Sequence, residues 1–193
     1  GKKDTVKVES VKQIIKELSA LYRKMIKCKI IGITGSNGKT TTKEMLFHVL
    51  SNFYRTSCTK GNYNSTIGLP LSIFSISNDD DFFVAEIGMN QKGEIRELVQ
   101  IIQPDLGVIT NVSEAHIGNF KNQNDILNEK IELFEYLSGK GVAFVNMNDS
   151  LISRHRIIEK CKVVKYGFNK DCNYRSQHFN CISNEININN YKF

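Results

Sequence analysis

Short runs of apolar, largely β-branched residues recur along this chain at intervals that a helix can span. The four clear runs and a weaker fifth occupy residues 29–34, 82–88, 106–112, 141–146 and 162–167. Their apolar residues are continuous rather than alternating, which is typical of strands that are covered on both faces. The runs therefore predict the central sheet of an α/β fold.

The segments between these runs have helical character, at residues 39–53, 92–102, 125–138 and 149–160. A further amphipathic helix is predicted at 10–27, before the first strand, with Ser10 as its cap. This alternation predicts a mostly parallel sheet flanked by helices, with right-handed crossovers. From residue 169 onward the chain is polar and rich in asparagine, and we expect at most a final strand there.

Composition limits the class of protein. Of 193 residues, 40% are hydrophobic and 24% charged, as in an ordinary globular domain. No apolar run approaches the ~18 residues that a membrane span needs, and the N-terminus lacks the apolar segment of a secretory signal. We therefore expect a cytoplasmic protein without a membrane partner. The formal charge of +6 suits an anionic ligand, but no aromatic-basic module accompanies it, so we expect no nucleic-acid partner.

The five cysteines form no recognisable framework. Their number is odd and none belongs to a C-x-x-C pair, which disfavours both disulfides and a zinc ribbon. Reduced thiols are the simplest interpretation. The length suits one domain, and we expect a monomer.

Polar residues follow the predicted strands, at the edge of a parallel sheet where ligands bind. "GSNGKTTT" follows the first strand, Glu86 ends the second, "NVSEAH" follows the third and "NMND" the fourth. A carboxylate at the end of a buried strand is costly unless it meets a cation. Glu86 is therefore expected either in a structural salt bridge or at a metal ion.

The stretch "IIGITGSNGKTTTKEM", residues 30–45, has the design of a phosphate-binding loop between a strand and a helix. Backbone N–H groups, the positive end of the following helix and a lysine ammonium would all face the phosphates, and the Thr40 hydroxyl would face Mg²⁺. The residues predicted to hold a nucleotide here are Gly35, Ser36, Asn37, Gly38, Lys39, Thr40 and Thr41. Ile33 replaces the first glycine of the usual G-x-x-x-x-G-K-[ST] pattern, so a turn without a ligand is the alternative.

The loop "TGSNGKTTTKEM" resembles the phosphate loop of the Mur ligases, the ATP-dependent amino acid and peptide ligases of peptidoglycan synthesis. Further segments resemble, in order, those of the family members that add D-alanyl-D-alanine: "GNYNSTIGLPLSI" (61–73), "AEIGMNQKGEI" (85–95), "TNVSEAHIGNF" (110–120) and "EKIELF" (129–134). The similarity runs from about residue 4 to about residue 167.

This resemblance implies a set of metal and catalytic residues. Glu86 would bind Mg²⁺ together with Thr40, and His116 would lie at a second ion. Lys130 matches the lysine that the family carries as a carbamate, formed with CO₂, which would also hold Mg²⁺. An unmodified surface lysine is the alternative there. The resemblance thus implies ATP and two Mg²⁺ ions as cofactors. It also implies four catalytic residues, which are Lys39, Glu86, His116 and Lys130.

The resemblance also implies substrate contacts. Asn146 matches an asparagine that contacts adenine, although the family's N-x-D-D has become Asn146-Met147-Asn148-Asp149 here, which leaves any role of Asn148 open. Asn62 and Asn64 lie in the loop that faces the nucleotide-sugar substrate in the family. As plain turn formers they would be equally at home.

The implied reaction is ATP-dependent amide formation. The γ-phosphoryl group of ATP would pass to the terminal carboxylate of UDP-MurNAc-tripeptide, and the amine of D-alanyl-D-alanine would attack the acyl phosphate. The resemblance divides the chain into a linker with its helix at 1–28, an ATP-binding central domain at 29–168 and a polar extension at 169–193. The family's N-terminal UDP-binding domain and C-terminal ligase domain would be absent, so we expect weak binding of ATP and Mg²⁺ and little or no ligation.

Other functions stay open from sequence alone. Another Mur ligase, or a relative of folylpolyglutamate or cyanophycin synthetase, would keep the chemistry and change the substrate. A P-loop kinase or switch NTPase would be expected to retain the first glycine of the loop. A non-catalytic nucleotide-binding module would not require its lysines, glutamate and histidine to converge.

Overall fold

The computed structural model describes residues 7–113, 119–120, 122–156, 160–180, 185–188 and 191–192, with the backbone alone from 177 onward. The strands are β1 (Lys29–Thr34), β2 (Thr56–Cys58), β3 (Phe82–Glu86), β4 (Leu106–Ile109), β5 (Val142–Asn146), β6 (Lys162–Gly167), β7 (Tyr174–Asn180), β8 (Glu185–Ile188) and β9 (Tyr191–Lys192). The helices are α1 (Val11–Met25), α2 (Lys39–Ser51), α3 (Gly68–Ile73), α4 (Glu94–Ile102), α5 (Gln123–Leu137) and α6 (Ser150–Ser153).

The strands form one sheet in the order β2-β3-β1-β4-β5-β6-β7-β8-β9. Every pairing from β2 through β7 is parallel, and β8 and β9 are antiparallel additions at one end. The mostly parallel α/β sheet expected from the sequence is therefore confirmed. Because β1 lies between β3 and β4, the segments that follow these three strands meet at the same edge of the sheet.

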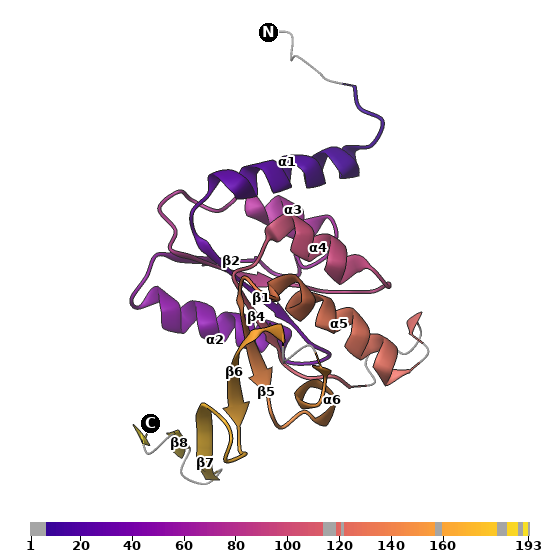
Figure 1. Ribbon diagram of the computed structural model, residues 1–193. Coiled ribbons are helices and arrows are strands. Elements are labelled where there is room, and N and C mark those ends of the chain that lie inside the picture. The colour runs from indigo at the N-terminus through magenta and orange to yellow at the C-terminus, as the bar shows by residue number, and fades with distance from the viewer. Residues whose placement is uncertain are drawn as a thin grey trace.

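Helices cover both faces of this sheet, as Figure 1 shows, with α2 on one side and α1, α3, α4 and α5 on the other. The larger core lies under the second group. The smaller one consists of Ile31, Ile33, Val84 and Val108, against which α2 packs Leu46 and Leu50. No helix in the described part of the chain has both the length and the apolar character needed to cross a membrane.

The short elements β2 and α3 were not predicted, and one predicted helix is wrong. The expectation of at most one strand after residue 169 is also wrong, because β7, β8 and β9 form there. β2 has three residues and α3 six, including Pro70, so neither carries enough of a periodic pattern to be recognised. Of the described residues in the helix predicted over 149–160, those that are α-helical are Ser150–Ser153, which form α6. Ile152 is its only buried residue, so α6 lacks the apolar stripe that would hold a longer helix against the sheet.

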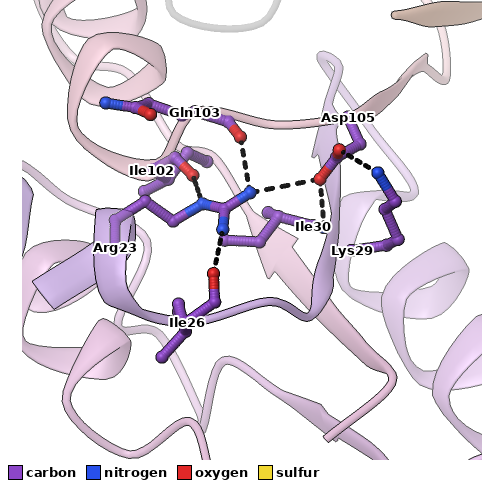
Figure 2. A network of polar contacts seen from close by, with 7 residues as sticks. All are labelled: Arg23, Ile26, Lys29, Ile30, Ile102, Gln103 and Asp105. Atoms are coloured by element: carbon purple, nitrogen blue, oxygen red, sulfur yellow. Dashed lines mark hydrogen bonds and ion pairs between the residues drawn. The ribbon is translucent and has the colours of Figure 1, made fainter. Parts of the chain in front are cut away.

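The first helix is docked onto the domain through a buried arginine, shown in Figure 2. The Arg23 guanidinium donates hydrogen bonds to three backbone carbonyls, at Ile26, Ile102 and Gln103, and to the Asp105 carboxylate at 3.1 Å. Asp105 also accepts hydrogen bonds from the Lys29 ammonium and from the Ile30 N–H. The end of α1 is thereby fixed to the start of β1 and to the segment between α4 and β4.

Candidate functional site

The loop between β1 and α2 is pressed against the segment that follows β4. The Ser36 N–H donates to the Asn111 carbonyl at 2.9 Å, and the Asn37 N–H donates to the Asn111 side chain at 3.0 Å. Gly35 makes this approach possible, because a Cβ there would overlap the Thr110 hydroxyl. The loop is therefore held in shape by residues of the neighbouring strand.

The first turn of α2 is open to an anion. Its N-terminal residue, Gly38, has φ 77° and no side chain caps the helix. Backbone N–H groups at such an uncapped start, together with the helix dipole, form a ready site for phosphate. The helix begins at Lys39 as predicted.

The Lys39 ammonium lies folded over its own loop. Its Nζ donates to the Gly35 carbonyl at 2.8 Å and to the Ser36 carbonyl at 3.3 Å. Desolvation lowers the pKa of this amine, while the Glu86 carboxylate acts in the opposite direction. A half-buried ammonium bonded only to neutral carbonyls has charge left to offer to a phosphate.

Glu86 ends β3 with only 3% of its surface exposed. Its Oε1 accepts a hydrogen bond from the side-chain amide of Asn64 at 2.9 Å, and its backbone N–H donates to the Thr59 hydroxyl at 3.1 Å. Among the described residues, Oε2 has no hydrogen-bond partner. The Lys43 ammonium lies 3.9 Å from this oxygen, so the structural salt bridge expected as one alternative is present. That distance is too long for a hydrogen bond, and it leaves Oε2 able to accept a second cation from the cavity.

These groups converge on one cavity of about 450 Å³ beyond the carboxyl ends of β1 and β3. The predicted site residues that line it are Ser36, Asn37, Gly38, Lys39, Thr40, Thr41, Asn64 and Glu86. Sequence reasoning missed the others, which are Ser65, Gly88, Met89, Asn90 and Glu94. The missed residues all lie within the segments 61–73 and 85–95 quoted above, but only the fold shows that they line the cavity.

The segment from Gly88 to Gly93 is held to α5 by a second buried carboxylate. Glu129, 4% exposed, accepts hydrogen bonds from the Gly93 N–H at 2.9 Å and the Ile95 N–H at 3.0 Å. It thereby caps the start of α4 from a neighbouring helix. One wall of the cavity is thus fixed relative to α5.

Lys130, the next residue of α5, is almost fully buried, at 1% exposure. Its Nζ lies 3.9 Å from the sulfur of Met89, which lines the cavity. Desolvation, with a smaller effect from the Lys39 charge, lowers the pKa of the Lys130 amine to about 7. The alternative of a solvated surface lysine is therefore wrong, because this side chain is buried beside the cavity wall.

Other predicted residues lie elsewhere. His116 falls outside the described residues. The Asn146 carboxamide donates to the Thr110 carbonyl at 2.8 Å and accepts from the Asn148 N–H at 3.0 Å, so it braces the ends of β4 and β5. Asn62 is exposed and its carbonyl accepts from the Asn64 N–H at 2.7 Å. Neither Asn146 nor Asn62 lines the cavity.

The donor set in the cavity fits a magnesium ion. The described residues contain no cluster of three His, Cys, Asp or Glu side chains that could hold a metal ion. Mg²⁺ usually takes one or two carboxylates together with waters and phosphate oxygens. The orphaned Oε2 of Glu86, in the same cavity as Thr40, matches that requirement.

A parallel sheet, a glycine loop after its central strand and a lysine at the start of the next helix define the class of phosphate-loop α/β domains. The chain belongs to the Mur ligase family, because the model of the Mur ligase middle domain matches residues 33–193.

Named relatives agree with this assignment. The chain is 34% identical over 170 residues to UDP-N-acetylmuramoyl-tripeptide--D-alanyl-D-alanine ligase from Bacillus subtilis, covering 88% of this chain and 36% of that protein. It superimposes on MurF from Acinetobacter baumannii with a TM-score of 0.84 at 30% identity, over 94% of this chain and 40% of the other. MurF from Thermotoga maritima in complex with ADP gives 0.86 at 26% identity, over 99% and 47%. The chain thus spans about a third of the curated relative's length.

Proposed function

We propose that this chain is the ATP-binding central domain of a ligase that adds D-alanyl-D-alanine to UDP-MurNAc-tripeptide. The observation that carries the proposal is that Lys39 and the orphaned carboxylate of Glu86 line one cavity at the phosphate loop. The B. subtilis relative is named for the same ligation, and the T. maritima structure holds ADP. In this proposal residues 29–168 are the central domain, between a linker with its helix at 1–28 and an extension at 169–193.

The nucleotide phosphates would lie over the loop from Gly35 to Thr41. Uncapped N–H groups at the start of α2 support this placement. The Lys39 ammonium would exchange its two loop carbonyls for phosphate oxygens, which as anions are stronger acceptors. Asn146 would contact adenine, although its carboxamide already forms hydrogen bonds with backbone groups of Thr110 and Asn148.

Thr40 and Glu86 would hold one Mg²⁺ ion, while His116 and Lys130 would hold a second. Bound magnesium would neutralise the charge that develops on phosphoryl oxygens during transfer. The residues of this chain would orient the phosphates and hold the carboxylate of Glu86 at the cavity.

Lys130 would serve as a carbamate. Its pKa of about 7 leaves much of the amine neutral near neutral pH. The lone pair of that neutral amine would form an N–C bond to CO₂ and one proton would leave, which gives an anionic carbamate. Starting from the ammonium, two protons leave in all. Burial supports this, because a lysine that cannot be solvated as an ammonium gives up its proton readily.

The reaction would proceed in two steps, which are phosphoryl transfer and amide formation. A carboxylate oxygen of UDP-MurNAc-tripeptide would bond to the γ-phosphorus as the bond to the β-γ bridging oxygen breaks, giving ADP and an acyl phosphate. The D-alanyl-D-alanine amine would then form the amide and release phosphate and a proton. Lys39 would stabilise charge on the transferring group throughout. Asn62 and Asn64 would face the nucleotide-sugar substrate.

We also propose a cytoplasmic monomer that has no nucleic-acid or membrane partner. Among the described residues, Cys28, Cys58, Cys161 and Cys172 are free thiols. Free thiols suit a reducing compartment.

Calorimetric titration of the chain with ADP and Mg²⁺ tests the nucleotide site. Lys39→Ala should weaken binding by about tenfold or more, since a charge-assisted contact is lost. Lys60→Ala, which removes an exposed lysine from another loop, should leave binding within about twofold. Equal affinities in all three proteins would contradict the proposal. The ligation itself is tested by phosphate release that depends on both tripeptide precursor and D-alanyl-D-alanine, in a protein that carries the flanking domains.

A further inference from the structure

One charged side chain in the larger neighbourhood of the cavity has no part in the proposed reaction. Lys43, one turn after Lys39 on α2, is among the largest fully buried side chains, with 1% of its surface exposed. A lysine is almost never buried to this extent unless it is paired. The groups around the Lys43 ammonium therefore indicate the role of its charge.

The Lys43 ammonium lies among three oxygen acceptors. It donates a hydrogen bond to the Thr59 carbonyl at 3.0 Å and forms an ion pair with the Glu44 carboxylate at 2.9 Å. The Oε2 of Glu86 lies 3.9 Å away, within ion-pair distance but beyond a hydrogen bond. Lys43 thus pairs closely with the exposed carboxylate of Glu44, while it attracts the buried carboxylate of Glu86 from a longer distance.

Thr59 fixes this arrangement from the opposite side. Its carbonyl accepts from Lys43, and its hydroxyl accepts from the Glu86 backbone N–H. The cation and the carboxylate are consequently set at a fixed separation by the same residue of the segment after β2. The Oε2 atom therefore lies near a cation but, among the described residues, accepts no hydrogen bond.

We infer that Lys43 is a positioning residue that acts as an internal counter-cation for Glu86, and that it limits how tightly the cavity binds a divalent cation. This rests on the proposed function, which places magnesium at Glu86. In the empty site the Lys43 ammonium lies 3.9 Å from the Glu86 carboxylate and is its counter-cation. When a divalent cation arrives, the two positive charges repel each other, so the cation binds more weakly than Glu86 alone would allow.

Glu44 competes with Glu86 for the Lys43 ammonium. Its carboxylate, half-exposed on α2, bonds to the same ammonium and so holds that ammonium away from Glu86. Removing Glu44 should release Lys43 toward Oε2. The two residues should therefore have opposite effects on cation affinity, and the effect of Glu44 should depend on Lys43.

The test measures Mn²⁺ affinity of the chain by the electron paramagnetic resonance signal of the free ion, at about pH 8, where carboxylates are ionised. Lys43→Met, which keeps the apolar stem, should tighten binding by about five- to tenfold. Glu44→Gln should weaken it by about threefold in the natural background, and by much less when Lys43 is already methionine. Lys60→Met is the matched loss of an exposed positive charge and should change affinity by less than about twofold.

A merely structural lysine predicts the opposite sign, since disturbing Glu86 would weaken binding. Unchanged or weaker Mn²⁺ affinity in folded Lys43→Met would overturn the inference. So would an equal effect of Glu44→Gln in both backgrounds. If Lys43→Met does not fold, thermal unfolding will reveal it. Glu44→Gln alone then tests the inference, because unchanged or tighter Mn²⁺ binding in that variant contradicts it. Glu86→Gln separates the two proposals: Mn²⁺ binding that does not depend on Glu86 overturns the proposed metal site itself.

Discussion

The side-chain amide of Asn64 donates a hydrogen bond of 2.9 Å to the Oε1 of Glu86, while the Asn64 carbonyl accepts the Gly88 N–H at 2.8 Å. Asn64 therefore joins the loop before α3 to the end of β3 and to the residue that follows it. A Cβ at Gly88 would lie 3.0 Å from Asn64, so the two backbones are closely packed. The orientation of the buried carboxylate depends on this loop.

Replacing Asn64 with alanine should weaken both Mn²⁺ and ADP binding by about three- to tenfold, because the Glu86 carboxylate loses the hydrogen bond that holds it. The variant should also lose about 1–2 kcal/mol of unfolding free energy, since a second buried oxygen becomes unpaired. Calorimetry and urea denaturation measure the two effects. Asn78→Ala, at an exposed position, is the control. Wild-type affinities in Asn64→Ala would show that Glu86 needs no support from the loop.

Arg23 should contribute far more to stability than an exposed arginine does. Arg23→Met removes donors from three carbonyls and from Asp105, and we expect a loss of about 2–4 kcal/mol in unfolding free energy. Arg96→Met breaks the exposed pair with Glu132 and should cost less than about 1 kcal/mol. Guanidinium denaturation of both variants makes the comparison. Similar losses would mean that α1 is held by its apolar contacts alone.

The fold follows from the sequence wherever burial is periodic. β1 and β6 have the predicted bounds, Lys29–Thr34 and Lys162–Gly167, because their apolar runs end abruptly in polar or glycine residues. β3 stops at Glu86, earlier than predicted. The Ile87 N–H still donates to the Ile33 carbonyl, and the chain then leaves the sheet at Gly88 and Met89, which line the cavity. Short elements such as β2 depend on long-range pairing that no local pattern records.

The site could be predicted only in part. The strand, glycines and lysine of the phosphate loop are local, so their pattern identified Lys39 directly. Lys43 looked like one more charged residue on a helix, and its burial depends on Thr59 and Glu86, which are distant in sequence. Asn111 holds the loop through its carbonyl and its side-chain amide, but its partners Ser36 and Asn37 are more than seventy residues away in sequence. Contacts of this kind leave little trace in a single sequence.

The burial of Lys130 should make stability depend on pH. Its pKa falls from 10.5 to about 7 in the folded protein, so between these values the unfolded chain holds more protons than the folded one. Unfolding free energy attributable to Lys130 therefore rises with pH across this window, by up to about 1.4 kcal/mol per pH unit, and the gain is lost as pH falls toward 7. Denaturation at about pH 7 and about pH 9 in CO₂-free buffer measures it.

Lys130→Met is the reference for that measurement, because it removes the titrating amine and leaves the other groups in place. Relative to it, the natural chain should gain about 1–2 kcal/mol between the two pH values. Parallel pH dependences would show that the amine stays solvated or protonated in the folded state. Readmitting CO₂ should stabilise only the natural chain if the carbamate forms.

Gly35 should be the least replaceable glycine of the loop. It has φ 154°, and a Cβ there would overlap the Thr110 hydroxyl and lie 3.2 Å from the Thr110 backbone nitrogen. Gly35→Ala must therefore push the loop away from β4, and we expect a loss of about 2–4 kcal/mol in unfolding free energy with at least about tenfold weaker ADP binding.

Gly139 provides the matched comparison for that change. Its φ is also positive, at 74°, but a Cβ there would meet nothing within 4 Å. Gly139→Ala should cost only the backbone strain, about 1 kcal/mol, and should leave ADP binding unchanged, because the turn lies at the opposite edge of the sheet from the cavity. Urea denaturation and calorimetry of both variants separate strain from steric overlap. If the two substitutions prove equally mild, the contact between the loop and Thr110 is not what shapes the phosphate site.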